Sequence, residues 1–310
     1  MSGHSFVLLE DGAKLAYQIL GAQHLGSSSR QPIVLVGGIS STRGDFERLS
    51  DELAKSRPVL VFDHRGIGDS TYSTEAKDDN ITIESMARDL CFLVESLQWD
   101  SISICGYSMG GVITLQLLFL PHIVNNPKPL PFKITHVFLT ATLTSVLKDK
   151  NYGVRLNPLP TDRELTPEVL REFIKPQMEL MFDPKWLADA STQARQEWWL
   201  SRMLIKRPYK TIVKQARATN RFDFSGLHSK LRNTRILIIH GTADRVVPYY
   251  CGEEIHRLMP WAQTVQVGSE PGQLPSLEFG HNWYEYFDIK VWRDVFETFL
   301  RSSGDQKARL

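Results

Sequence analysis

The sequence predicts an α/β fold in which a mostly parallel central sheet is flanked by helices and carries a helical insertion. Short runs rich in β-branched residues alternate with segments whose apolar residues recur at helical spacing, a pattern typical of parallel sheets wrapped by helices. The alternation stops after Leu139 and resumes only at Ile236. With 310 residues, 42% of them hydrophobic, the chain is long enough for one large domain carrying such an insertion.

Six short apolar runs are predicted to form the buried strands of the sheet. They are Ile33–Val36, Val59–Phe62, Ile102–Cys105, Val137–Leu139, Ile236–Ile239 and Val265–Val267. Five segments with apolar residues at helical spacing are predicted to be the flanking helices. They are Asp45–Lys55, Ile83–Leu97, Gly110–Leu120, Cys251–Met259 and Trp283–Leu300. The runs Phe6–Leu9 and Lys14–Ile19 are joined by a turn signal at Glu10–Gly12, which predicts an antiparallel pair at one edge.

Residues 148–225 are predicted to form several short helices, separated by prolines, that lie over the sheet as a cap. The prolines are Pro158, Pro160, Pro167, Pro176, Pro184 and Pro208. The core domain would then comprise residues 1–147 and 226–301, followed by a flexible tail at 302–310. The alternative is a second, independently folded domain, which we favour less because the chain leaves and re-enters one sheet.

Charge and cysteine content exclude several functional classes. Lys and Arg number 36 against 35 Asp and Glu, a net charge of +1, so we expect no nucleic-acid partner and no attraction to anionic lipid. Cys91, Cys105 and Cys251 lack the spacing of a zinc site, so we expect a reducing compartment and no metal or other cofactor. Met1–Glu10 has no signal-peptide character, and Pro121 ends the longest apolar helix candidate, so we expect no membrane span.

The last three residues, Ala308-Arg309-Leu310, have the small-basic-leucine form of a peroxisomal address. Such an address must be exposed to its import receptor, and the preceding Ser302–Gln306 has the composition of a flexible polar tail. The sequence therefore predicts a peroxisomal location through the import receptor. The alternative is a cytoplasmic protein in which the tripeptide occurs by chance, and nothing in the sequence indicates an oligomeric state.

The strongest catalytic signal follows the third predicted buried strand. There Gly106-Tyr107-Ser108-Met109-Gly110 reads Gly-x-Ser-x-Gly between a strand and a helix. A sharp strand-to-helix turn strains its central residue, and flanking glycines avoid the resulting clashes. We therefore expect Ser108 to project above the sheet at a helix N-terminus, where the Met109 N–H can stabilise negative charge.

With this motif the chain resembles the α/β-hydrolase family, and the resemblance extends along nearly all of the sequence. The family usually has His-Gly after its first parallel strand, followed by a residue whose N–H donates to the oxyanion. Here Gly37-Gly38 precede Ile39, so the histidine is missing, but a main-chain donor at Ile39 can still serve beside Met109. The segment Asp63–Ser70 matches the family's Asp-x-Arg-Gly-x-Gly-x-Ser turn, in which we expect His64 to be a packed turn residue.

The resemblance also implies an acid and a base. The segment His240–Pro248 resembles the one that carries the family's acid, which makes Asp244 the candidate, whereas the alternative position at Thr140–Ser145 offers no carboxylate. His281 is the one histidine between the last predicted strand and the C-terminal helix, so the chain order Ser, Asp, His is satisfied. We expect His240 and His256 to be structural.

The resulting hypothesis is a serine hydrolase that cleaves an ester, lactone or acyl thioester of a hydrophobic small molecule through an acyl-enzyme on Ser108. We expect Gly38, Tyr107, Trp198 and Trp199 to contact this substrate. The alternative for the two tryptophans is that they form the core of the cap. The alternatives for the function are a C–C bond hydrolase or lyase that uses the same three residues, and a non-catalytic small-molecule receptor.

Overall fold

The sheet of the computed structural model has its parallel strands at the centre. The structure describes residues 3–26, 30–74, 80–154, 164–205 and 207–302. In these residues the strands are β1 Ser5–Leu8, β2 Lys14–Leu20, β3 Ile33–Val36, β4 Val59–Phe62, β5 Ser101–Tyr107, β6 Lys133–Thr140, β7 Arg235–Ile239 and β8 Gln263–Thr264. Their order is β1-β2-β4-β3-β5-β6-β7-β8. All pairs from β4 to β8 are parallel, and β1 and β2 add the predicted antiparallel edge.

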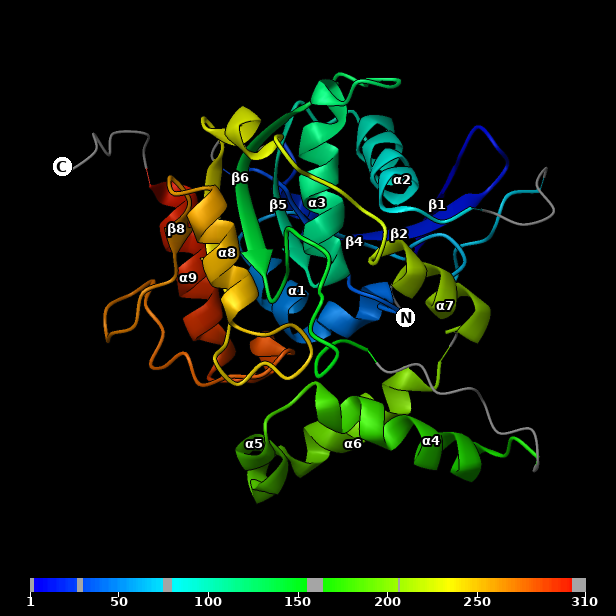
Figure 1. The fold of residues 1–310 in the computed structure, drawn as a ribbon, viewed down its shortest axis with the longest axis vertical. Helices are drawn as coiled ribbons and strands as arrows, with labels where there is room; N and C mark the ends of the chain where they lie inside the picture. Colours follow the sequence, from blue (N-terminus) through cyan, green and yellow to red (C-terminus); the bar gives the residue numbers. More distant parts are fainter. Residues whose placement is uncertain (1–2, 27–29, 75–79, 155–163, 206, 303–310) are drawn as a thin grey trace.

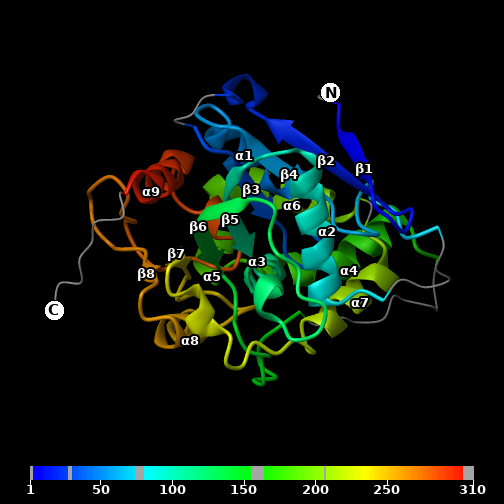
Figure 2. The ribbon, with the colours of Figure 1, turned by 90° about the horizontal axis from the view of Figure 1, so that it is seen from above.

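Helices cover both faces of the sheet (Figures 1 and 2). Those described are α1 Glu47–Leu53, α2 Ile83–Ser96, α3 Met109–Phe119, α4 Pro167–Leu180, α5 Pro184–Ala188, α6 Gln193–Met203, α7 Tyr209–Ala218, α8 Tyr250–Leu258 and α9 Ile289–Arg301. Figure 2 shows α1 and α9 on one face and α2, α3 and α8 on the other. The predicted α/β architecture is therefore confirmed.

The core has two parts because side chains alternate across a strand. Val34 and Val36 of β3 belong to the cluster under α2 and α3, whereas Ile33 and Leu35 belong to the cluster under α1 and α9. All four side chains have no exposed surface. A strand buried on both faces explains why the sequence shows a continuous apolar run here.

One predicted strand is wrong in position. The sequence predicts Val265–Val267, but the edge strand β8 comprises only Gln263 and Thr264. Val267 makes a single isolated bridge to Leu274. Both residues of β8 are exposed, so an edge strand of this kind has no apolar run by which the sequence could reveal it.

One predicted helix begins later than expected. The pattern predicts Trp283–Leu300, but α9 starts at Ile289 after a 3₁₀ turn at Trp283–Glu285. Phe287 between them has φ 62°, and the Asp288 carboxylate accepts a hydrogen bond from the Lys290 N–H at 2.9 Å. Asp288 therefore caps the N-terminus of α9. Trp283 and Tyr284 before it are buried in the core without belonging to this helix. The remaining predicted elements overlap the observed ones.

Residues 148–225, here called the helical segment, contribute α4 to α7 and no strand in their described part. Figure 1 shows α4, α5 and α6 beyond the carboxyl ends of the central strands, and α4 packs on α6. Helices α4 and α5 begin at Pro167 and Pro184, two of the prolines that are predicted to separate short helices. Pro176, however, lies inside α4 and does not end it. The division of the chain into a core and a cap stays a prediction.

Among the described residues, no helix is both long enough and apolar enough to cross a lipid bilayer.

Candidate active site

Ser108 lies in the tight turn between β5 and α3. Its backbone has φ 55° and ψ −125°, a left-handed conformation that costs free energy in a non-glycine residue. The neighbouring glycines leave no room for a side chain, because a Cβ on Gly106 would lie 2.6 Å from the Gly110 carbonyl oxygen. A Cβ on Gly110 would lie 2.1 Å from the Val36 carbonyl oxygen. The glycines of the motif therefore allow α3 to approach the sheet closely behind the serine.

The structure brings the three predicted triad residues together. The Ser108 Oγ lies 3.0 Å from the His281 Nε2, and the His281 Nδ1 lies 2.8 Å from the Asp244 Oδ2. The other carboxylate oxygen, Oδ1, accepts hydrogen bonds from the N–H groups of Val246 and Val247 at 2.8 and 2.9 Å. All three triad side chains are buried or nearly so. The geometry suits a hydroxyl activated by an imidazole that a carboxylate orients.

The electrostatics keep the Asp244 carboxylate ionised. Burial by itself raises its pKa, but the charge of His281 and hydrogen bonds from His240 and His281 lower the pKa well below its usual value. The His240 Nε2 lies 3.5 Å from Asp244 Oδ2 and 2.9 Å from the Val247 carbonyl oxygen. These contacts fit the predicted structural role of His240, but they also bring its ring close to Asp244, which the sequence did not suggest.

Two neighbours fix the position of the His281 ring. The ring of Tyr107 lies 5.0 Å from it, centroid to centroid. The Tyr107 hydroxyl donates to the Asn282 Oδ1 at 2.6 Å, and the Asn282 N–H donates to the Met181 carbonyl oxygen at 3.1 Å. The serine turn and the histidine loop are thus joined by a buried hydrogen bond.

The loop Gly37–Ser41, here called the oxyanion loop, lies against the serine. A Cβ on Gly38 would lie 3.0 Å from the Ser108 Cβ and 3.4 Å from its Oγ. Within the described residues, the N–H groups of Ile39 and Met109 donate to no protein acceptor. Both are therefore free to donate to an atom bound in front of Ser108, where the sequence predicts an oxyanion.

His64 binds the main chain of this loop at Gly37. It is buried and its Nε2 pairs with the Gly37 carbonyl oxygen at 2.9 Å. Burial lowers the pKa of His64, so at neutral pH the ring is uncharged and donates from Nε2 to this carbonyl. The structure therefore agrees with the prediction of a packed turn residue.

Comparison with known proteins identifies the family. The sequence profile described as alpha/beta hydrolase fold matches residues 31–272. The chain belongs to this family. The α/β hydrolase is 33% identical over 88 residues to the sn-1-specific diacylglycerol lipase ABHD11 of Xenopus tropicalis, an alignment that covers 28% of this chain and 26% of the lipase. It thus spans about a quarter of that relative's length.

Two solved structures have the same fold over nearly the whole chain. The esterase EaEST from Exiguobacterium antarcticum has a TM-score of 0.67 and 19% identity, and covers 97% of this α/β hydrolase and 100% of its own chain. The enol-lactonase from Burkholderia xenovorans LB400 has a TM-score of 0.64 and 20% identity, with coverages of 96% and 100%. At these identities the likeness shows the fold alone.

A cavity of about 1550 Å³ opens in front of the triad of this α/β hydrolase. Ser108, His281, Gly38 and Tyr107 line it. That Gly38 and Tyr107 contact a substrate stays a prediction. Its apolar wall comes mainly from the helical segment, by way of Leu170, Phe173, Ile174, Leu180, Met181, Leu187, Met203, Leu204 and Ile212. Among the described residues, no group of three His, Cys, Asp or Glu side chains could hold a metal ion.

The two tryptophans predicted to contact the substrate do not line this cavity. Trp199 is 3% exposed and packs against Phe182 in the core cluster under α9. Trp198 packs against Trp199, and the Arg195 guanidinium lies 4.1 Å above its ring. Because neither side chain lines the cavity and both have packing partners, the prediction is corrected in favour of a packing role, the alternative that the sequence left open.

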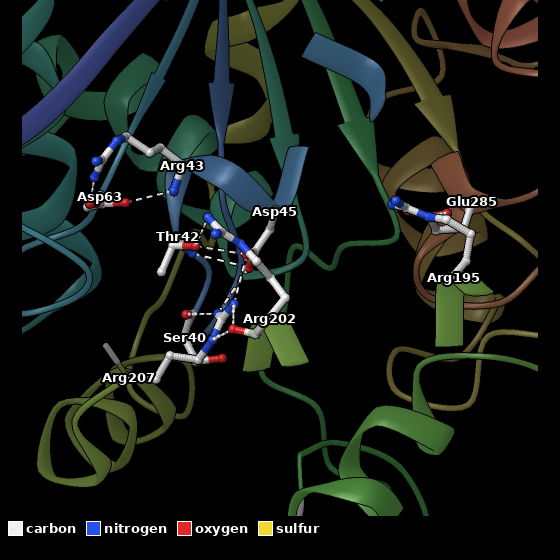
Figure 3. Close-up of polar contacts among 9 residues, drawn as sticks. All are labelled: Ser40, Thr42, Arg43, Asp45, Asp63, Arg195, Arg202, Arg207 and Glu285. Carbon is white, nitrogen blue, oxygen red and sulfur yellow. Dashed lines mark hydrogen bonds and ion pairs between the residues drawn. The ribbon is translucent and has the colours of Figure 1, made fainter. Parts of the chain in front are cut away.

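Three residues at the site were missed by sequence reasoning. Arg207 and Gln215 from the helical segment bind the main chain of Ser40 in the oxyanion loop. Asp45 anchors Arg207, as Figure 3 shows. Arg207 also lines the cavity. No sequence motif marks Arg207 or Gln215, because more than 150 residues separate them from the loop and only the fold brings them together. Asp45 is near the loop in sequence, but its partner Arg207 is 162 residues away.

Proposed function

We propose that this α/β hydrolase is a serine hydrolase that cleaves an ester, lactone or acyl thioester of a hydrophobic small molecule through an acyl-enzyme on Ser108. The observation that supports the proposal is the hydrogen-bonded series Ser108–His281–Asp244 in the wall of a large, mainly apolar cavity. Each residue has the contacts that its role requires.

In the proposed reaction, the Ser108 Oγ attacks the substrate carbonyl carbon while its proton passes to the His281 Nε2. The Asp244 carboxylate stabilises the imidazolium, and the N–H groups of Ile39 and Met109 donate to the oxyanion. Collapse of the tetrahedral intermediate expels the alcohol or thiol, which takes the proton from His281. Water then attacks the acyl-enzyme, again giving a proton to His281, and the acid leaves as Ser108 regains its hydrogen.

The cavity supports a bulky, apolar substrate. Its volume of about 1550 Å³ exceeds the roughly 300–1,000 Å³ of common small-molecule sites. Leu170, Phe173 and Ile174 of α4 line it with apolar surface. An acyl or alkoxy group placed along α4 would leave the reacting carbonyl beside Ser108. The esterase and enol-lactonase of the same fold make esters and lactones the first substrates to test.

We also propose that Ala308-Arg309-Leu310 directs the protein to peroxisomes through the import receptor. These residues lie outside the described residues. The test is a fluorescent protein fused to the N-terminus, with and without Leu310. Punctate fluorescence that co-localises with a peroxisomal marker and becomes diffuse without Leu310 is expected, and diffuse fluorescence in both cases would favour the cytoplasm.

The hydrolase proposal is tested by active-site labelling. A fluorophosphonate probe should modify the wild-type protein at Ser108, as read by mass spectrometry of its peptides. The protein should also hydrolyse p-nitrophenyl esters of increasing chain length, lactones or acyl thioesters, and Ser108→Ala should retain the fold and lose both properties. Undiminished turnover by Ser108→Ala, or labelling without turnover of any such substrate, would contradict the proposal, the latter in favour of a receptor or a C–C lyase.

A further inference from the structure

The oxyanion loop is bound through Ser40 by side chains that come from the helical segment. Ser40 has φ 62°, a left-handed conformation that needs outside support in a serine. Its N–H donates to the Gln215 Oε1 at 2.8 Å, and its carbonyl oxygen accepts a hydrogen bond from the Arg207 Nη1. Both polar main-chain groups of the residue after Ile39 are therefore fixed by partners outside the loop.

Arg207 is itself held by a buried ion pair. Its guanidinium binds the Asp45 carboxylate at two points, with Nη2 to Oδ1 at 2.7 Å and Nη1 to Oδ2 at 3.0 Å. The two side chains are only 6% and 5% exposed. The same carboxylate accepts from the Thr42 N–H and hydroxyl at 3.1 and 2.8 Å, as Figure 3 shows. Such bidentate, nearly desolvated pairs have a fixed geometry, which a lysine could not reproduce.

Gln215 is held by burial rather than by an ion pair. It has no exposed surface and lies on α7, one turn after Thr211, which is also fully buried. The Thr211 hydroxyl donates to the Gly66 carbonyl oxygen at 3.1 Å, so α7 is docked on the turn that follows β4. The side-chain amide therefore presents its oxygen to Ser40 from a rigid helix.

We propose that Arg207 and Gln215 are positioning residues that set the direction of the Ile39 N–H. This inference rests on the proposed function, because the Ile39 N–H matters only if an oxyanion forms at Ser108. A shift of Ser40 would move the adjoining Ile39 and, with it, the Gly38–Ile39 peptide group that carries the Ile39 N–H, so that one donor to the transition state would be misaligned. The helical segment would then contribute to catalysis as well as to the shape of the cavity.

Arg207 and Gln215 could also affect activity only by stabilising the fold, so the test needs a control. The chain offers one in a second ion pair that joins the helical segment to the rest of the chain. Arg195 of α6 binds Glu285 at two points, with Nε to Oε2 at 3.0 Å and Nη2 to Oε1 at 2.6 Å. This pair also joins the helical segment to the rest of the chain, but it does not contact the oxyanion loop (Figure 3). Without Arg195, Glu285 would retain Arg48 at 3.6 Å. Arg195→Ala therefore reports the effect of losing an ion pair, together with the contact between Arg195 and the Trp198 ring, at a place away from the oxyanion loop.

The experiment compares Arg207→Ala, Arg207→Lys and Gln215→Leu with Arg195→Ala and the wild type. The readouts are the acylation rate from the p-nitrophenol burst, KM, the affinity for an aryl boronic acid that forms a tetrahedral serine adduct, and Tm. We expect Arg207→Ala and Gln215→Leu to lower the acylation rate and boronate affinity by about 10- to 100-fold, with KM changed by less than about threefold. Arg207→Lys should lie between, and Arg195→Ala should acylate within about twofold of the wild type.

The inference would be overturned if both variants acylated at the rate of Arg195→Ala, whatever their Tm. If Arg207→Ala did not fold, Gln215→Leu would decide, because Gln215 carries no charge and does not line the cavity. Labelling of Ser108 in the wild-type protein tests the proposed function separately. If the wild-type enzyme is labelled and active but the variants acylate at the rate of Arg195→Ala, the positioning role is contradicted while the proposed function stands.

Discussion

The triad and the oxyanion loop, although adjacent, are held by different means. Ser108 follows β5, and Asp244 is fixed by main-chain N–H groups two and three residues further along its own loop. The oxyanion loop instead depends on Arg207 and Gln215, which belong to the helical segment. The comparison teaches that the turn of the proposed nucleophile Ser108 is formed by local chain geometry, whereas the loop that carries the proposed oxyanion donor Ile39 depends on the docking of distant helices.

The largest loss of activity is expected from a substitution in the proposed triad. Asp244→Asn retains an oxygen for the N–H groups of Val246 and Val247, so the loop should keep its shape and Tm should change little. The amide cannot stabilise the imidazolium, however, and kcat should fall by about 10⁴-fold. Steady-state kinetics together with thermal unfolding check this. A variant with kcat near the wild-type value would exclude Asp244 as the acid.

The next largest loss of activity is expected at Gly38, where the oxyanion loop lies close to Ser108. In Gly38→Ala the added methyl group would lie 3.0 Å from the Ser108 Cβ, so either the serine or the loop must shift. We expect the acylation rate to fall by about 10- to 100-fold while the protein remains folded. Stopped-flow burst kinetics measure this rate. A rate equal to that of the wild type would show that the loop yields without consequence, contrary to the close fit described above.

A smaller effect is expected where the helical segment shapes the cavity. Ile174→Trp should fill part of the apolar wall and lower kcat/KM for a long-chain p-nitrophenyl ester by about tenfold, leaving the acetate within about twofold. Lys175→Ala, an exposed position on the same helix, is the matched control. The ratio of the two kcat/KM values is the measurement. Equal losses on both esters would mean that α4 does not contact the acyl chain.

The smallest expected effect is on the free energy of unfolding, and it comes from His136, a residue outside the candidate active site. Burial and the charges of Arg235 and Arg57 lower the pKa of His136 on β6 from 6.5 to about 4. The folded state thus binds this proton less readily than the unfolded state does. The contribution of His136 to the free energy of unfolding is therefore fully present above its pKa in the unfolded state, 6.5. It is lost as the pH falls from about 6.5 towards 4.

Between about pH 7 and pH 5, the wild-type protein should therefore lose about 1–2 kcal/mol more unfolding free energy than His136→Gln. Urea unfolding at the two pH values measures the difference. Activity at neutral pH should be the same in both proteins, since His136 contacts Thr135 and Arg235 rather than the triad. Parallel pH profiles of stability would contradict the expectation.

The sequence predicted the fold wherever local patterns reflect burial. The bounds of β3 and β4 agree with prediction because both strands are apolar throughout. The edge strand β8 and the start of α9 were misplaced, since exposed Gln263 carries no strand pattern and buried Trp283 imitates a helical one. Trp198 and Trp199 were assigned to the substrate because an apolar side chain looks the same in sequence whether it packs in a core or lines a cavity.

By itself, the sequence determined the turn that carries Ser108, because glycine spacing between a strand and a helix is a local requirement. It also determined the chain order of Ser108, Asp244 and His281, which fits a parallel sheet whose strands all end at one edge. Only the tertiary structure decided that Arg207 and Gln215 bind Ser40 and that α4 forms the cavity wall. Such contacts depend on how helices dock, which is set by packing over distances that no local pattern encodes.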